Sequence, residues 1–203
     1  MTKSTKGRET MKSAIRIALA AALAVPAAGL ADSWSIDGSH SRAGFSVRHL
    51  VISDVKGEFT KLSGKVSIDE KDLAKSSVEA TIEAASIDTR EPKRDNHLRS
   101  EDFFDVAKCP TITFKSTKVE PGADGKVKVA GNLTMRCTTK PVVLDGELTQ
   151  PIKDQMGGTR RGFSATTKVN RKDFGVSWSK VADVGPVVGD EVRIDVQAEI
   201  VKD

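Results

Sequence analysis

Apolar and polar residues alternate along most of the chain. Residues 77–83, S-V-E-A-T-I-E, place Val78, Ala80 and Ile82 on one side of an extended segment and polar side chains on the other. A period of two is typical of a β-strand with one buried face and one wet face. The pattern recurs at residues 43–47, 62–68, 112–114, 127–135, 142–148, 163–169 and 192–200. The sequence therefore predicts an all-β domain of about eight strands.

The clean alternation favours antiparallel pairing, because the two faces of such a sheet meet different surroundings. Turn signals at residues 121–125, 145–146 and 157–158 separate the strands. Eight antiparallel strands can close into a barrel, which leaves no exposed edge, and a two-sheet sandwich with a filled core is the alternative. Small residues on the apolar faces, including Ala43, Gly64 and Ala80, favour a barrel with free interior space.

One long segment, residues 86–105, does not alternate. Pro92 interrupts any preceding strand, and Asp95 is predicted to cap a short helical insertion that contains Leu98. The segment is strongly charged but ends in Phe103 and Phe104. Two adjacent phenylalanines need an apolar surface, so we expect them to rest on the mouth of the barrel.

The chain begins with features of a secretory signal peptide. Lys12 and Arg16 precede an apolar run at residues 17–25, and small residues lead to Ala31. The run is shorter than the ~20 residues of a membrane span. We expect residues 1–31 to be cleaved and residues 32–203 to form one exported domain. An uncleaved signal anchor is the alternative, and Met11 is an alternative start to Met1.

Removal of the leader changes the charge balance. The whole chain holds 32 Lys and Arg against 28 Asp and Glu, and the leader holds five of the former and one of the latter. The remaining chain has 27 of each and no net charge, which gives no support for nucleic acid as a partner.

Cys109 and Cys137 form an even pair in an exported chain, which favours a disulfide. A hairpin that pairs Val119 with Lys126 would set Cys109 opposite position 136, one residue from Cys137. Two buried thiols and a redox pair remain as alternatives.

No catalytic constellation is present in the sequence. His40, His49 and His97 lack the spacing of metal ligands, so no metal site is predicted. The chain has no G-x-S-x-G elbow and no phosphate-binding loop followed by a helix. We therefore expect a binding protein, not an enzyme.

Aromatic residues outside the alternation are the remaining signal. Phe103, Phe104, Phe174 and Trp178 either plug the barrel end as additional core or line an entrance. Arg94, Arg99, Arg171 and Lys172 lie beside them in sequence. An apolar tunnel with a partly basic lip suits a long lipid with a small or anionic head.

Several motifs, taken in order, resemble the YceI-like, polyisoprenoid-binding family. The motifs are W-x-I-D-x-x-H-S at 34–41, G-F-S-V-R-H at 44–49, V-K-G-E-F at 55–59, S-I-D-T at 86–89, R-D-x-H-L-x-S-x-D-F-F-D at 94–105, P-T-I-T-F-K-S-T at 110–117, G-N-L-T-M at 131–135, N-R-x-D-F-G at 170–175 and V-G-D-E-V at 188–192. The departures are Cys109, where an aromatic is more usual, and Cys137, where glycine is common.

The resemblance implies a lipocalin-like antiparallel barrel that holds a polyprenyl chain, such as a quinone side chain or polyprenyl phosphate, in the periplasm. With strand parity, it assigns an apolar pore to Phe45, Val47, Ile82, Phe103, Phe104, Phe114, Leu133, Phe163, Phe174 and Trp178. It assigns a polar lip to His49, Arg94, His97 and Arg171.

The predicted function is therefore a carrier of an isoprenoid lipid or quinone, with no cofactor other than the bound lipid. The chain is expected to make transient membrane contact without spanning a membrane, as a monomer or homodimer. One alternative is a redox or quinone-modifying partner that uses Cys109 and Cys137. Another is a structural or stress-response barrel that holds no ligand.

Overall fold

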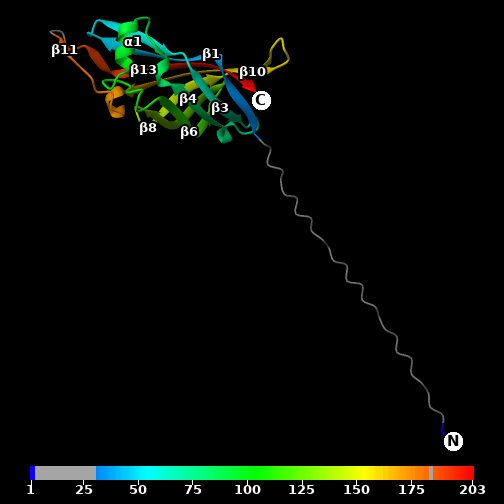
Figure 1. Cartoon of the computed structure of the whole chain (residues 1–203). Coiled ribbons are helices and arrows are strands. Elements are labelled where there is room, and N and C mark those ends of the chain that lie inside the picture. The colour runs from blue at the N-terminus through cyan, green and yellow to red at the C-terminus, as the bar shows by residue number, and fades with distance from the viewer. Residues whose placement is uncertain (3–30, 183–184) are drawn as a thin grey trace.

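Eight antiparallel strands close into a barrel in the computed structural model, which describes residues 1–2, 31–182 and 185–203 (Figure 1). Around the barrel, each strand pairs with the next, and pairing of β1 with β13 closes the ring. In ring order the strands are β1 (Asp32–His49), β3 (Leu62–Ile68), β4 (Ser77–Glu83), β6 (Thr111–Pro121), β7 (Lys126–Met135), β8 (Thr138–Leu148), β10 (Thr159–Asn170) and β13 (Val188–Lys202). The barrel prediction is confirmed. The predicted leader lies outside the described residues, apart from residues 1–2 and 31.

Among the described residues, five short strands lie outside the ring of eight. β2 (Ser53–Phe59) continues β3 along the same edge of β1, and β5 (Ile87–Asp88) pairs with β2. β9 (Ile152–Lys153) pairs with the start of β10. β11 (Val181–Ala182) and β12 (Gly185–Pro186) form a separate two-stranded sheet. In Figure 1, β11 lies at the end of the barrel opposite the C-terminus.

The alternation in the sequence determines which side chains face inward. On β7, Val127, Val129, Gly131, Leu133 and Met135 are buried, whereas Lys126, Lys128 and Asn132, on the other face, are exposed. The wet outer face carries cross-strand ion pairs, such as Lys115–Glu79 and Lys168–Glu191. Burial of one face of each strand is the main stabilising term for such a barrel, since it scales with the apolar area removed from water.

The helical insertion begins at a different cap from the one predicted. α1 (Pro92–Arg99) starts with proline in its first turn, and the Glu91 side chain accepts a hydrogen bond from the Lys93 amide. Proline is favoured there because its missing N–H has no helical partner anyway. Asp95, predicted to be the cap, lies within α1 instead. Its side chain is buried and accepts hydrogen bonds from the amide and the hydroxyl of Thr89. Asp95 therefore anchors α1 to the segment that precedes it.

In the described part of the chain, three 3₁₀-helices connect strands: η1 (Leu73–Lys75), η2 (Ala84–Ser86) and η3 (Arg171–Phe174). Within the described residues, no helix combines the length and apolar character needed to cross a membrane.

The register of the β6–β7 hairpin differs from the predicted one, in which Val119 would pair with Lys126. Val119 pairs with Val129, and a bulge between Ser116 and Lys118 shifts the pairing further along. The Gly122 amide bonds the Lys126 carbonyl, and Asp124 and Gly125 take positive φ, so the turn begins after Pro121. The predicted turn at residues 145–146 is wrong, since both residues lie within β8 and pair with β7. An Asp-Gly pair alone is therefore not a reliable sign that a strand ends.

Cys109 and Cys137 form a disulfide despite that register difference, with their Cα atoms 5.5 Å apart. Cys109 lies just before β6, whereas Cys137 lies in the two-residue turn between β7 and β8. Arg136 and Cys137 both have positive φ in that turn. The bridge ties the segment that follows α1 to one end of the β7–β8 hairpin.

Candidate ligand-binding cavity

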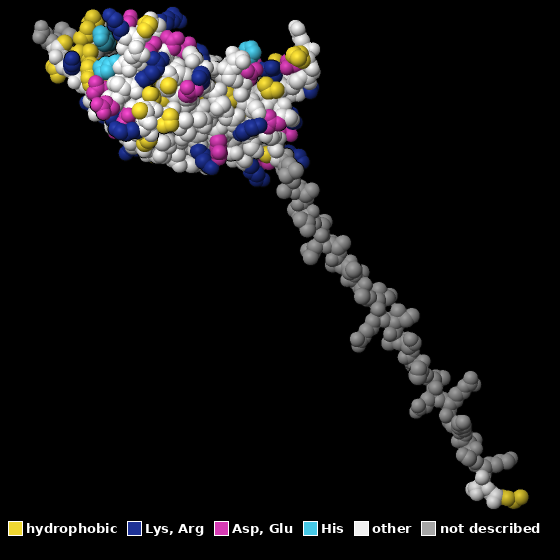
Figure 2. Space-filling view, in the orientation of Figure 1, with side chains coloured by type: hydrophobic (Ala, Val, Ile, Leu, Met, Phe, Trp, Pro, Cys, Tyr) yellow, Lys and Arg dark blue, Asp and Glu magenta, His cyan; other side chains and the backbone are white. Residues whose placement is uncertain are grey.

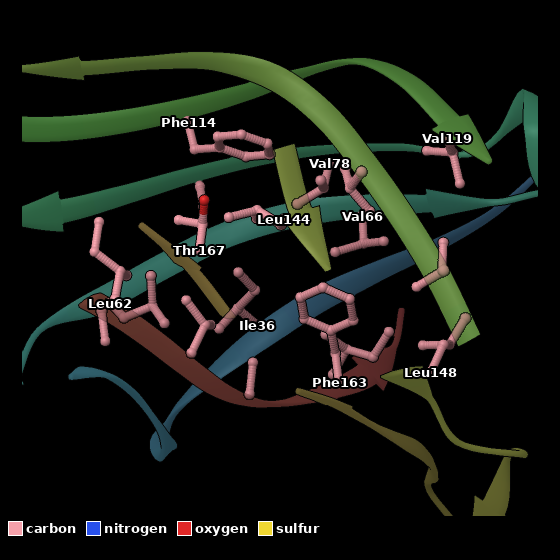
Figure 3. A pocket seen from close by; sticks show the side chains of 18 of the residues that line it. Ile36, Leu62, Val66, Val78, Phe114, Val119, Leu144, Leu148, Phe163 and Thr167 are labelled. Atoms are coloured by element: carbon pink, nitrogen blue, oxygen red, sulfur yellow. The ribbon is translucent and has the colours of Figure 1, made fainter. Parts of the chain in front are cut away.

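Two apolar cavities follow one another through the barrel. The first, here called the inner cavity, has a volume of about 310 Å³ and is walled mainly by the barrel strands (Figure 3). The second, the mouth cavity, has about 250 Å³ and is bordered by α1 and the segment after η3. Both volumes are near the lower end of the range for small-molecule sites, about 300–1,000 Å³. The barrel is therefore not filled by its own side chains.

Four side chains border both cavities and separate them: Phe45, Phe59, Met135 and Ile194. The rings of Phe45 and Phe59 are 5.9 Å apart and tilted. Methionine is flexible and polarisable, and it adapts readily to changes in the space around it. No polar side chain is among these four, so the partition between the two cavities is apolar.

Aliphatic and aromatic side chains from every barrel strand form the inner wall. In Figure 3 the side chains of Ile36, Leu144 and Phe163 project into the same space from different strands. Phe114 lies across β7 because residue 131 is glycine: a Cβ there would be 2.4 Å from its Cζ atom. The small residue at 131 therefore makes room for an aromatic ring, while Ala43, Ala80 and Ala198 border the open space.

The mouth cavity is covered by the segment that does not alternate. Phe104 packs edge-on against Phe59, with ring centres 5.5 Å apart. Phe103 lies 5.2 Å from Trp178, and the His97 ring stands edge-on to both. The two phenylalanines after α1 thus rest on the barrel mouth, the position their sequence context suggested.

The structure distributes the predicted pore residues between the two cavities, with one exception. The inner wall includes Phe45, Ile82, Phe114, Leu133 and Phe163. The mouth wall includes Phe45, Val47, Phe103, Phe104 and Trp178. Phe174 is not among the residues that border either cavity: its side chain is 1% exposed and belongs to a packed cluster with Ile112 and Val169. η3 ends at Gly175 in a left-handed conformation, and Phe174 packs into the core there.

The four predicted lip residues, His49, Arg94, His97 and Arg171, all border the mouth cavity. Their hydrogen bonds differ. Arg94 donates to the hydroxyl and carbonyl of Thr89, and its Nη1 atom has no acceptor among the described residues. The Nε2 atom of His97 lies 2.8 Å from a carboxylate oxygen of Asp102. Arg94 and His49 therefore retain polar atoms that could face a ligand head group.

Arg171 borders the mouth cavity but is buried, with its side chain only 4% exposed. Its guanidinium donates to the carbonyls of Gly189, Val176 and Trp178 at 2.7–2.8 Å. Burial lowers the pKa of this guanidinium, and nearby Asp190 partly opposes that shift. Arg171 therefore holds the segment after η3 against the barrel, and its donors are already used.

We expect Arg171→Met to lower the free energy of unfolding by about 3 kcal/mol or more, because buried carbonyls would lose their donors. The matched control is Lys172→Met, an exposed cation that pairs with the same Asp190 and should cost less than about 1 kcal/mol. Urea unfolding of both variants measures the difference. Near-normal stability of Arg171→Met together with lost ligand would instead assign Arg171 to the head group.

The structure adds functional candidates that sequence reasoning missed. Phe59, Met135 and Ile194 form most of the partition, although alternation had indicated only that Met135 and Ile194 face inward. Arg161 borders the far end of the inner cavity, where Nε donates to the Thr149 carbonyl and Nη1 to Glu70. Strand parity with Phe163 was the available signal for Arg161, since both lie on the inner face of β10.

A cluster of possible metal ligands lies on the outside of the barrel. Asp37, His40 and Glu199 bring ligand atoms within 4.8 Å of one another. The Arg160 guanidinium already bonds Asp37 at 2.7 Å and Glu199 at 3.3 Å. Arg160, followed by His40, holds the pKa of the Asp37 carboxyl well below its ordinary value. The group therefore acts as an ion-pair network that joins β1, β10 and β13.

The fold and the cavities together define a lipocalin-like barrel with an apolar interior able to bind a ligand. The chain belongs to the YceI-like family, because residues 34–200 match the model of the YceI-like domain. A UPF0312 protein of Vibrio cholerae is 40% identical over 167 residues, which cover 81% of this chain and 88% of the relative. A UPF0312 protein of Vibrio parahaemolyticus is 38% identical and covers 93% and 96%.

Solved structures share the architecture. A YceI protein of Campylobacter jejuni is 33% identical, with a TM-score of 0.66 over 77% of this chain and 90% of that one. BcnA of Burkholderia cenocepacia is 24% identical, with a TM-score of 0.72 over 81% and 98%. A domain from Saccharophagus degradans, described as polyisoprenoid binding, is 15% identical, with a TM-score of 0.63 over 86% and 99%. The last two likenesses concern the fold alone.

Proposed function

We propose that this protein is a periplasmic carrier that holds a polyisoprenoid lipid, such as a quinone or polyprenyl phosphate, inside the barrel. The observation that carries the proposal is a pair of apolar cavities in series, about 310 and 250 Å³, separated only by four apolar side chains. Two cavities in this arrangement suit a slender chain better than a compact ligand. The description of the Saccharophagus degradans domain as polyisoprenoid binding supports this class of chain.

The hydrophobic effect supplies enough free energy for such binding without polar contacts. Each methylene group transferred from water into the barrel contributes about 0.8 kcal/mol. A chain that extends from the mouth cavity into the inner cavity therefore gains affinity with length. Chain length should matter more than the chemistry of the head group.

The head group is placed at the mouth cavity in this proposal. His49 borders that cavity, and the Nη1 atom of Arg94 has no acceptor among the described residues. Both groups can donate to a quinone carbonyl or a phosphate oxygen.

Export to the periplasm is supported by the leader pattern and by the disulfide. The charged start, apolar run and small residues before residue 32 are typical of a signal peptide. Disulfides persist in oxidising compartments such as the periplasm, and Cys109 and Cys137 are bridged. Binding, not catalysis, is the proposed activity.

Native mass spectrometry of protein purified without detergent tests the proposal. We expect a complex that releases a polyprenyl lipid on activation, identified by extraction and fragmentation. Protein that is recovered empty, and that stays empty after incubation with polyprenyl phosphate or a long-chain quinone, would overturn the proposal and favour a barrel without a ligand.

A further inference from the structure

The turn between β1 and β2 departs from the usual chemistry of hairpin turns. It consists of Leu50, Val51 and Ile52, and Leu50 and Val51 take positive φ values of 48° and 64°. Glycine, asparagine and aspartate are favoured in this left-handed region, whereas a β-branched residue there is strained. Val51 and Ile52 are also 51% and 75% exposed. Leu50 is half-buried, but neither turn preference nor burial in the fold explains the exposed aliphatic residues Val51 and Ile52.

A third exposed aliphatic side chain lies on the neighbouring loop. Val181 on β11 is 85% exposed. The Leu50 amide donates to the Val187 carbonyl at 3.0 Å, and Gly185 lies against Val51. These contacts join the two loops, and we call the exposed side chains of Val51, Ile52 and Val181 the apolar tip. Figure 2 shows hydrophobic atoms gathered at this end of the molecule, beside histidine and basic side chains.

The apolar tip adjoins the opening of the proposed binding path. His49 and Val187, which flank it in the two loops, both border the mouth cavity. The tip therefore projects from the end of the barrel through which a lipid would enter. Exposed apolar side chains that gather at the rim of such a site make it a candidate interaction surface.

The charges around the tip fit a phospholipid surface. Arg48, which precedes the β1–β2 turn, and Lys180, which precedes β11, are both exposed. Arg48 bonds the Val51 carbonyl at 3.1 Å and also faces Asp54, whereas Lys180 lies over the Trp178 ring, 5.9 Å from its centre. Aliphatic tips flanked by cations and an aromatic residue are suited to the boundary between acyl chains and phosphates.

We propose that the apolar tip docks this protein on the surface of a lipid bilayer, with the mouth cavity facing the membrane. The inference extends the proposed carrier function, since docking would let a lipid chain pass between bilayer and barrel without crossing water. The aliphatic side chains enter the boundary of the acyl chains, while Arg48 and Lys180 contact phosphate groups. The strain and exposure of the turn are then balanced by its contact with lipid.

Flotation of the purified protein with vesicles of phosphatidylethanolamine and phosphatidylglycerol tests docking directly. The wild type should float with the vesicles, and the double variant Ile52→Asp/Val181→Asp should lose about tenfold or more of the bound fraction. The matched control is Ile152→Asp. Ile152 is 64% exposed on β9, which pairs with the opposite end of β10, and its variant should bind within about twofold of the wild type.

Failure of the wild type to float, or an equal loss in the Ile152→Asp control, would overturn the docking proposal. So would a wild-type dimer that the tip substitutions dissociate while vesicle binding stays unchanged, because the tip would then join two copies of the chain. Native mass spectrometry on the same samples separates this result from the carrier function. Lipid-loaded protein that does not float contradicts docking alone, and empty protein that floats contradicts the carrier alone.

Discussion

Leu144→Asp is expected to abolish lipid retention, whereas Val143→Asp is expected to leave it unchanged. The two residues are neighbours on β8, but Leu144 borders the inner cavity and Val143 is 47% exposed on the outer face. A carboxylate inside the cavity would have to lose its water when the chain enters, which costs several kcal/mol without a partner. Mass spectrometric measurement of extracted lipid per protein compares the two variants.

A charge at this inward position is also expected to lower the stability of the fold. A second, uncharged substitution at the same position therefore separates loss of the site from loss of folding. Leu144→Trp fills part of the inner cavity with apolar atoms and should reduce the retained lipid or shorten its chain, at a stability cost of about 1–3 kcal/mol. Thermal unfolding shows whether each variant still folds. Wild-type amounts of the same lipid in folded Leu144→Asp and Leu144→Trp would refute the inner cavity as the site.

Removal of the disulfide is expected to cost stability but not binding. The bridge closes a loop with a sequence separation of 28 residues. In the chain-entropy model a loop of this size contributes about 3–4 kcal/mol. The double variant Cys109→Ala/Cys137→Ser should therefore melt roughly 10 °C lower. Neither cysteine is among the described residues that border the cavities, so the lipid content should remain at the wild-type level.

Denaturant unfolding of the wild type with and without reductant provides the control. Reduced wild type and the double variant should have the same unfolding midpoint. If reduction left that midpoint unchanged, the bridge would not stabilise the fold as expected. If loss of the cysteines changed the oxidation state of a bound quinone, the alternative of a redox partner would gain direct support.

Much of the barrel could be predicted because period-two alternation is a local property of the chain. The inward parity of Phe114 and Leu133 followed from their own strands, and both border the inner cavity. The position of Phe103 and Phe104 followed from a simple need, since two apolar rings in a charged segment require an apolar surface. The burial of Arg171 and Phe174 was harder to predict, because it depends on atoms from residues far away in the sequence.

The amino-acid sequence by itself determined the strands, the face that each strand turns inward, and the family. It could do so because neighbouring residues encode periodicity, and because ordered motifs persist along one chain. Only the tertiary structure decided the hairpin register, the closing of β1 on β13, and the division of the interior by Phe45, Phe59, Met135 and Ile194. These features depend on bulges and on contacts between residues far apart in the chain, where alternation specifies a face but not a partner.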